Sequence, residues 1–194
     1  DGRPLAEYNL GYYRGLTGSA FQEPPLYALS LRENLQAYRE CGDREISSAL
    51  QRLSMDKLLE KGNASLDTPL TRTFDKGGIV LSGGERQKLS IARLMVGEFG
   101  LLIYDEPTAA LDPIAEANLN SIIFAEDNRA TTVLISHRLT NVVNADYIYV
   151  MKGGRIAEEG THASLMEQQG YYHEMFTLQA KNYIAASEEV LCAC

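Results

Sequence analysis

Cysteine is scarce in this sequence, and its placement excludes a disulfide framework. The 194 residues include three cysteines, two of them at the extreme C-terminal end. An odd count distributed in this way does not pair into a set of bridges, and a reducing compartment fits it. Cys192 and Cys194 also lack the further ligands that a zinc site needs.

Basic clusters and long apolar runs are lacking as well. The formal net charge is −8, from 18 Lys and Arg against 26 Asp and Glu, and no block of five or more basic residues occurs. We therefore expect no binding to nucleic acid and no broad attraction to an anionic membrane surface. No charge-free apolar run approaches the roughly 20 residues needed to cross a bilayer. The first ten residues have neither the basic region nor the apolar core of a signal peptide.

What the sequence does contain is an alternation of short apolar runs and segments with helical periodicity. Residues 1–21 are rich in turn formers, and Pro24-Pro25 excludes a helix at that point. Helices are predicted over residues 30–60, 82–99, 114–124, 161–166 and 171–184. Buried strands are predicted over residues 100–106 and 129–137, and a hairpin around Gly153-Gly154 over 146–160. This alternation predicts an α/β sheet in which residues 30–60 form an inserted helical piece.

Two adjacent carboxylates, Asp105 and Glu106, end the first apolar run. The carboxyl ends of strands are where open α/β sheets bind ligands. In nucleotide hydrolases an Asp at this position holds Mg²⁺, and a carboxylate beside it can orient or deprotonate the attacking water. The pattern is equally compatible with a solvated strand end or with caps for the following turn.

The segment LSGGE, consisting of Leu81, Ser82, Gly83, Gly84 and Glu85, opens the helix predicted from residue 82. Ser82 and Glu85 have the spacing of a capping box. Glycine is a poor helix former in a first turn, so Gly83 and Gly84 need another reason. The absence of side chains allows close approach of an external group, and a helix N-terminus can hold a phosphate.

Gln22 and His137 are weaker candidates when each is read alone. Gln22 lies on a loop, where its amide could bind Mg²⁺ or position water, or could simply be polar. His137 ends the second apolar run, so parallel pairing would bring it to the same sheet edge as Glu106. There it could contact a γ-phosphate, although a loop histidine is the alternative.

The order of these motifs resembles the ATP-binding domain of ABC transporters, from near residue 1 to about residue 183. By this resemblance, the assignments are Gln22 for the Q-loop, Leu81–Glu85 for the signature motif, Leu101–Glu106 for the Walker B strand, Ala109–Asp112 for the D-loop and His137 for the switch histidine. The segments SLRENL and FDKGGIVLSGGE are most similar to bacterial exporters, in which Thr71–Gly78 would contact the membrane domain. Ala109 replaces the usual serine of the D-loop.

The resemblance implies a P-loop NTPase-like, mostly parallel sheet with an inserted helical subdomain. We expect a partial ATPase domain over 1–183, with residues 30–98 as the helical and signature subdomain, residues 1–29 and 99–183 as the α/β core, and a disordered tail over 184–194. The phosphate loop G-x-x-x-x-G-K-S/T does not occur in this sequence. Since the chain also does not begin with Met, we expect a fragment without the N-terminal strands, which alone binds ATP weakly or not at all.

The resemblance further implies a mechanism, partners and location. Two such domains close head to tail around two ATP molecules, as a homodimer or heterodimer attached to a transmembrane domain at the cytoplasmic face of the cell membrane. Glu106 and His137 take catalytic roles, Asp105 and Gln22 hold Mg²⁺, and Asp112 belongs to the D-loop. Residues 81–85 contact the nucleotide of the partner domain. The same motifs occur in ATPase heads of DNA-repair or chromosome-organising proteins, but the chain has no heptad run and ends in the hairpin and EGTH segment typical of transporters.

Overall fold

The computed structural model describes residues 2–60, 64–73, 76–125 and 130–192. Their contacts divide the chain into two compact units, Asp1–Ile135 and Ser136–Cys194. Each unit is described separately. The predicted domain boundaries, 1–183 with a helical part over 30–98, remain a prediction.

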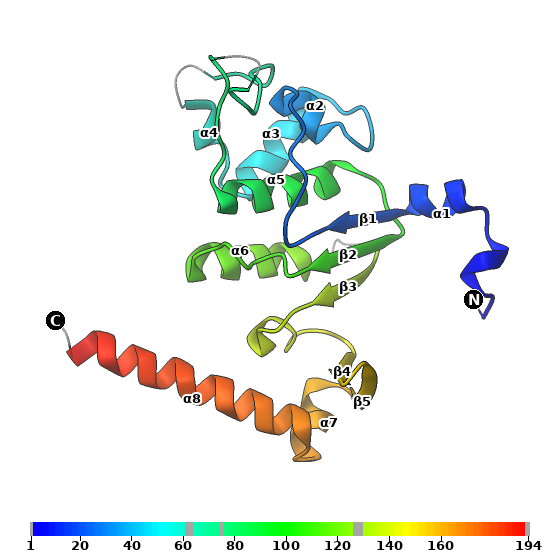
Figure 1. Ribbon diagram of the computed structural model, residues 1–194, viewed down its shortest axis with the longest axis vertical. Coiled ribbons are helices and arrows are strands. Elements are labelled where there is room, and N and C mark those ends of the chain that lie inside the picture. Colours follow the sequence, from blue (N-terminus) through cyan, green and yellow to red (C-terminus); the bar gives the residue numbers. More distant parts are fainter. Residues whose placement is uncertain (1, 61–63, 74–75, 126–129, 193–194) are drawn as a thin grey trace. The chain divides into compact units, whose positions relative to one another are not determined.

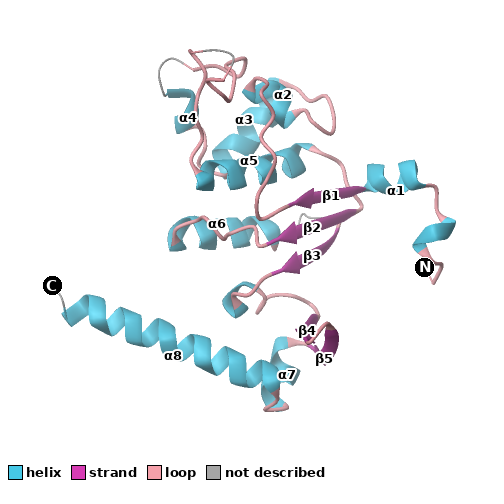
Figure 2. Cartoon of the chain, viewed as in Figure 1, coloured by secondary structure: helices cyan, strands magenta, loops and turns pink. Residues whose placement is uncertain are grey.

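A parallel three-stranded sheet is the centre of the first unit. Its strands are β1 (Thr17–Ala20), β2 (Leu101–Asp105) and β3 (Thr131–Ile135), in the order β1-β2-β3. The three arrowheads point the same way in Figure 2. Residues 21–100 lie between the neighbouring strands β1 and β2 in the sequence, which confirms an α/β fold with a helical insertion.

Two expectations about this sheet were wrong. Residues 1–21 are not mainly turns, because η1 (Leu5–Glu7), α1 (Leu10–Leu16) and β1 occupy most of them. β3 was expected to be a buried strand, but its Val133 and Ile135 side chains are 44% and 49% exposed. Within the described sheet β3 has one neighbouring strand, so these residues lie on an edge strand.

The helical insertion contains α2 (Leu31–Leu35), α3 (Asp43–Arg52) and α4 (Lys57–Glu60), followed by α5 (Gly83–Val96). Figure 1 shows α5 between the sheet and the shorter helices, and α5 contacts α2, α3 and β1. Its apolar positions, such as Leu89, Ile91 and Ala92, are almost fully buried. The predicted capping box of Ser30 and Glu33 is confirmed at the start of α2. The first unit also contains α6 (Pro113–Ile123), which follows β2.

The second unit contains η3 (Leu139–Asn141), β4 (Ile148–Lys152), β5 (Arg155–Gly160), α7 (His162–Glu167) and α8 (Tyr171–Cys192). The predicted hairpin is confirmed, since β4 and β5 pair antiparallel and Gly153 and Gly154 have φ angles of 58° and 74°. Two consecutive positive φ angles are what a tight hairpin turn requires. Thr161 caps α7 as predicted, by accepting the N–H of Ser164.

The last helix of the chain, α8, continues through Cys192. The disordered tail expected over residues 184–194 stays a prediction. Residues 193 and 194 lie outside the described part of the chain. No helix within the described ranges combines the length and the apolar character that crossing a bilayer requires.

Candidate functional site

The carboxyl ends of β1 and β2 bring three predicted site residues to one edge of the sheet. Ala20, the last residue of β1, pairs with Tyr104, so the chain leaves both strands at the same level. Gln22 follows β1 by two residues, Asp105 ends β2, and Glu106 comes next. This edge is where open α/β sheets bind ligands. The strand end predicted at Asp105 is confirmed, and the sheet adds Gln22 to the same edge. The functions of these residues stay predictions.

Glu106 has an unusual backbone conformation. Its φ angle is 49°, in the left-handed region that side-chain-bearing residues adopt at a cost of about 1–2 kcal/mol. Its N–H donates to the carbonyl oxygen of Ile135 at 3.0 Å, and its own carbonyl accepts the N–H of Ala109 at 3.2 Å. A strained residue of this kind persists only where its surroundings hold it. The structure therefore fixes Glu106 at the start of a tight turn.

The start of α5 is the capping box that the sequence predicted. The Ser82 N–H and hydroxyl donate to Glu85 Oε2 at 2.8 and 2.9 Å, and the Glu85 N–H donates to Ser82 Oγ at 3.3 Å. These reciprocal bonds satisfy helix-end donors that otherwise have no intrahelical partner. Ser82 and Gly83 are exposed, whereas Gly84 and Glu85 are half-buried.

Gly84 has a partner that the sequence did not reveal. A Cβ atom at this position would lie 3.2 Å from both the Ala110 carbonyl oxygen and Leu111 Cδ2. The close approach that we attributed to an external group is made here by the loop between β2 and α6 of the same chain. At Gly83 the corresponding distance to Ala110 Cβ is 3.6 Å, an ordinary contact. Glycine at position 84 is thus explained by packing within the chain.

Asp112, predicted to belong to the D-loop, caps α6. Its Oδ1 accepts the N–H groups of Ala115 and Ile114 at 2.9 and 3.0 Å. These bonds, that from Ala115 most strongly, lower the pKa of the Asp112 carboxyl below its ordinary value because they stabilise the charged form. The carboxylate therefore fixes the end of the loop that begins at Glu106.

His137 belongs to the second unit and is described with it. Its side chain is exposed, and its carbonyl oxygen accepts the Gln179 Nε2 amide at 2.7 Å. The Oε1 of Gln179 accepts the Leu139 N–H at 2.9 Å, so α8 holds both sides of the His137 loop. Glu106 belongs to the first unit, and the predicted proximity of His137 to it stays a prediction.

A buried polar cluster that sequence reasoning missed connects the segment after Gln22 to α5. Arg93 is 4% exposed, and its Nε and Nη2 donate to the carbonyl and Oδ1 of Asn34 at 2.9 and 2.6 Å. Its Nη1 donates to the Pro25 carbonyl at 2.7 Å, and its guanidinium carbon lies 5.0 Å from the centre of the Tyr27 ring. Burial lowers the pKa of Arg93. The arginine inside the mostly apolar run LSIARLM is the sequence feature that could have indicated this buried cluster.

Gln87 is the second residue that the sequence analysis missed. It is 3% exposed and lies one turn into α5, whose other buried positions are mostly apolar. Its Oε1 accepts the Ala110 N–H at 3.0 Å, and its Nε2 is 3.5 Å from the Glu106 carbonyl oxygen. A polar residue two positions after LSGGE was the sequence feature that could have indicated it.

The residues at the sheet edge fit Mg²⁺ chemically. Mg²⁺ prefers hard oxygen ligands and usually takes one or two carboxylates, with phosphate and water oxygens completing its shell. Asp105 and Gln22 offer such oxygens from neighbouring strand ends. In the described ranges, no group of three or more His, Cys, Asp and Glu side chains could form a metal site by itself. The donor set thus suits an ion that is held mainly by a bound phosphate.

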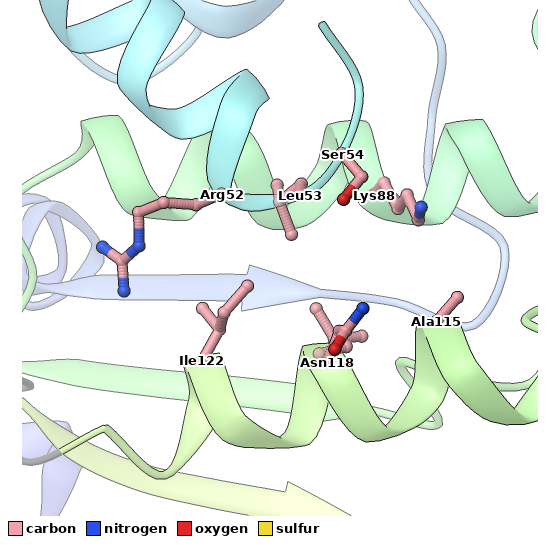
Figure 3. Close-up of a pocket in the computed structure, with 8 residues that line it drawn as sticks. Arg52, Leu53, Ser54, Lys88, Ala115, Asn118 and Ile122 are labelled. Atoms are coloured by element: carbon pink, nitrogen blue, oxygen red, sulfur yellow. The ribbon is translucent and has the colours of Figure 1, made fainter. Parts of the chain in front are cut away.

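A small cavity away from this edge offers no alternative site. Its volume is about 10 Å³, room for roughly one water molecule. It lies between α5, α6 and the end of α3, and its lining residues are shown in Figure 3. The charged ends of Arg52 and Lys88 point away from each other there, so they do not form a common anion site.

Comparison with known proteins gives a consistent result. The family model described as ABC transporter matches residues 1–109. The sophorolipid transporter of Starmerella bombicola is 35% identical over 184 residues, which are 92% of this chain and 14% of that protein. The ATP-dependent lipid A-core flippase of Neisseria gonorrhoeae is 34% identical over 186 residues, 95% of this chain and 29% of that protein.

A solved structure agrees with these sequence relatives. It is described as a bacterial Atm1-family ABC exporter with ATP bound, and it is similar to this chain with a TM-score of 0.82 and 30% identity. The match covers 93% of this chain and 31% of that one. The chain thus spans less than a third of the length of each of these proteins.

Proposed function

Because this chain belongs to the ABC transporter family, we propose that it is the ATP-binding and ATP-hydrolysing domain of a membrane exporter. The observation that carries the proposal is the sheet edge at which Gln22, Asp105 and Glu106 follow paired parallel strands. The similarity to an Atm1-family exporter over 93% of the chain supports the same assignment. The domain would act at the cytoplasmic face of the membrane, attached to a transmembrane domain.

The reaction we propose is attack of water on the γ-phosphate of ATP. Glu106 orients this water and accepts its proton, and His137 contacts the γ-phosphate. Asp105 and Gln22 would hold Mg²⁺, which supplies positive charge against the phosphate oxygens when bound. The turn that begins at Glu106 keeps the carboxylate at the strand end, which limits its motion before the reaction.

We propose that a second ATPase domain completes each site. In this arrangement Ser82, Gly83 and the N–H groups at the start of α5 contact the nucleotide held by the partner. The support is the exposure of Ser82 and Gly83 at a helix N-terminus, where N–H groups and the helix dipole favour an anion. Gly84 is instead packed against the loop of its own chain. Closure and reopening of the two domains would drive the attached membrane helices.

The test is a substitution of the proposed base in the full-length protein. We expect Glu106→Gln to retain ATP binding and to lower the rate of phosphate release by about 10²-fold or more, because the amide cannot accept the proton. The matched control is Glu98→Gln, since the Glu98 side chain is 83% exposed and lies two residues beyond the end of α5. Phosphate release at the parental rate in Glu106→Gln would refute the assignment of the base.

A further inference from the structure

Gln87 joins α5 to the turn that carries Glu106. Its buried amide meets this turn at both ends, since Oε1 accepts the Ala110 N–H at 3.0 Å and Nε2 faces the Glu106 carbonyl at 3.5 Å. The bond to Ala110 is the stronger of the two by distance. A single side chain therefore spans the turn from its first residue to its fifth.

The turn is closed in part by backbone hydrogen bonds of its own, including that from the Leu111 N–H to the Thr108 carbonyl at 3.0 Å. Glu106 is held in the left-handed region, and its carbonyl bonds the Ala109 N–H within the turn. The Thr108 side chain is 1% exposed and donates to Glu116 Oε1 at 3.0 Å, which ties the middle of the turn to α6. Gln87 supplies the corresponding tie to α5. The turn is thus held from two helices, one on each side in the sequence.

Burial of a glutamine amide at this position calls for an explanation. A buried amide is costly unless its donor and acceptor are paired, whereas Met or Leu would fill the volume without such partners. Both partners of Gln87 lie in the turn that begins at Glu106. The Glu106 carbonyl and the Ala110 N–H are 19 and 23 residues after Gln87 in the sequence. The polar atoms of Gln87 therefore hold this turn in position, whereas an apolar side chain would be enough to bury this face of α5.

We propose that Gln87 is a positioning residue that links the start of α5 to the Glu106 turn. Gln87 is five residues after Ser82 on the same helix, about one and a half turns away. The contact of Gly84 with Ala110 and Leu111 provides a second connection between α5 and this loop.

This role rests on the proposed function and extends it. In the proposed dimer, Ser82 contacts the ATP held by the partner, while Glu106 activates the water that attacks the ATP held by its own chain. A rigid connection between them makes the position of Glu106 depend on whether the partner's nucleotide engages α5. Gln87 therefore couples the two ATP sites by a hydrogen-bonded route within one chain.

The experiment compares Gln87→Met with Gln36→Met in the full-length protein. Methionine keeps the volume and removes the hydrogen bonds in both cases. Gln36 is a suitable control because its Nε2 also donates to a backbone carbonyl, that of Cys41 at 2.7 Å, but in the helical insertion. The readouts are the melting temperature, amide hydrogen exchange of residues 106–111, and kcat, KM and the Hill coefficient for ATP.

For Gln87→Met we expect faster exchange of the Ala110 amide, a fall in kcat of about tenfold or more, and a Hill coefficient closer to one. KM for ATP should stay within about twofold, because Gln87 does not touch the proposed nucleotide contacts. For Gln36→Met we expect parental exchange in this segment and parental kcat. If Gln87 has only a structural role, Gln87→Met will have a lower melting temperature but an unchanged kcat per folded molecule. That result would overturn the proposal.

A second variant keeps the test decisive if Gln87→Met does not fold. In Gln87→Glu, the carboxylate can still accept the Ala110 N–H but cannot donate to the Glu106 carbonyl. We expect the Ala110 amide to stay protected and kcat to fall by less than about tenfold, because the contact with the Glu106 carbonyl is lost. A parental kcat in Gln87→Glu would overturn the role of Gln87. Exchange and kcat both at parental values in the methionine variant, or an equal loss in Gln36→Met, would overturn the role of Gln87. A parental protein that does not hydrolyse ATP would instead refute the proposed function, and exchange at Ala110 would still report whether Gln87 holds the turn.

Discussion

The buried Arg93 side chain is expected to contribute strongly to the stability of the first unit. Its guanidinium makes three hydrogen bonds, two to Asn34 and one to the Pro25 carbonyl, in a site that is 4% exposed. Asn34 in turn donates to the carbonyl oxygens of Tyr27, Leu29 and Ser30. Removal of the guanidinium therefore affects the whole segment between Gln22 and α2.

The expected cost of Arg93→Met follows from these bonds. A hydrogen bond to a charged group contributes about 1.5–3 kcal/mol, and bonds within one network are not additive. We expect a loss of about 3–5 kcal/mol in the free energy of unfolding, a large part of the 5–15 kcal/mol typical of a domain. With a urea dependence of about 2 kcal/mol per molar, the unfolding midpoint should fall by about 2 M. Arg93→Lys should be intermediate, because one ammonium cannot reach three acceptors in a fixed plane.

The assay is urea unfolding of the parent and the variants, followed by circular dichroism. Arg39→Met is the matched control, because Arg39 also donates to a backbone carbonyl, that of Val96 at 2.9 Å, and pairs with Glu45 at 2.7 Å. Its side chain is 34% exposed, so solvent screens its ion pair and the contribution of this pair to stability should be small. If Arg93→Met costs no more than Arg39→Met, the reasoning from burial and hydrogen bonding is refuted.

Two further predictions concern the loop between β2 and α6. Gly84→Ala should destabilise the protein by about 1–3 kcal/mol, because the added methyl group meets the Ala110 carbonyl oxygen at 3.2 Å, and urea unfolding beside Gly83→Ala as the control would show it. The lowered pKa of Asp112 means that its stabilisation is present above pH 4, the range of an unfolded Asp, and is lost as the pH falls through the folded value. The difference in melting temperature between the parent and Asp112→Ala should therefore be largest at pH 5–7 and shrink towards pH 3, and a pH-independent difference would contradict this.

The parts of the fold that the sequence predicted correctly depend on residues close together in the chain. The capping boxes of Ser30 and Ser82 join residues three apart, and the turn between β4 and β5 depends on two adjacent glycines. The motif order that identified the family is likewise a property of the linear sequence. Apolar periodicity located α5 and β2 to within a few residues because both are buried on a contiguous face.

Burial was predicted less well, because it depends on which element packs against which. The apolar sequence of β3 suggested a buried strand, yet Val133 and Ile135 are about half exposed in the described sheet. The glycine at position 84 was interpreted correctly as a site of close approach, but the group that approaches is the chain's own loop at Ala110. A residue type such as glycine shows that a position has little space, but it does not show which part of the molecule lies next to it.

Local patterns in the chain account for the order of elements, the helix caps, the hairpin and the family, because each is encoded over a few residues or in a linear order. Tertiary packing is needed to bring Arg93 to Asn34 and Pro25, 59 and 68 residues away, and Gln87 to the turn of Glu106. Such bonds form when hydrophobic packing of α5 brings distant backbone groups to a buried side chain, and burial then makes their pairing obligatory.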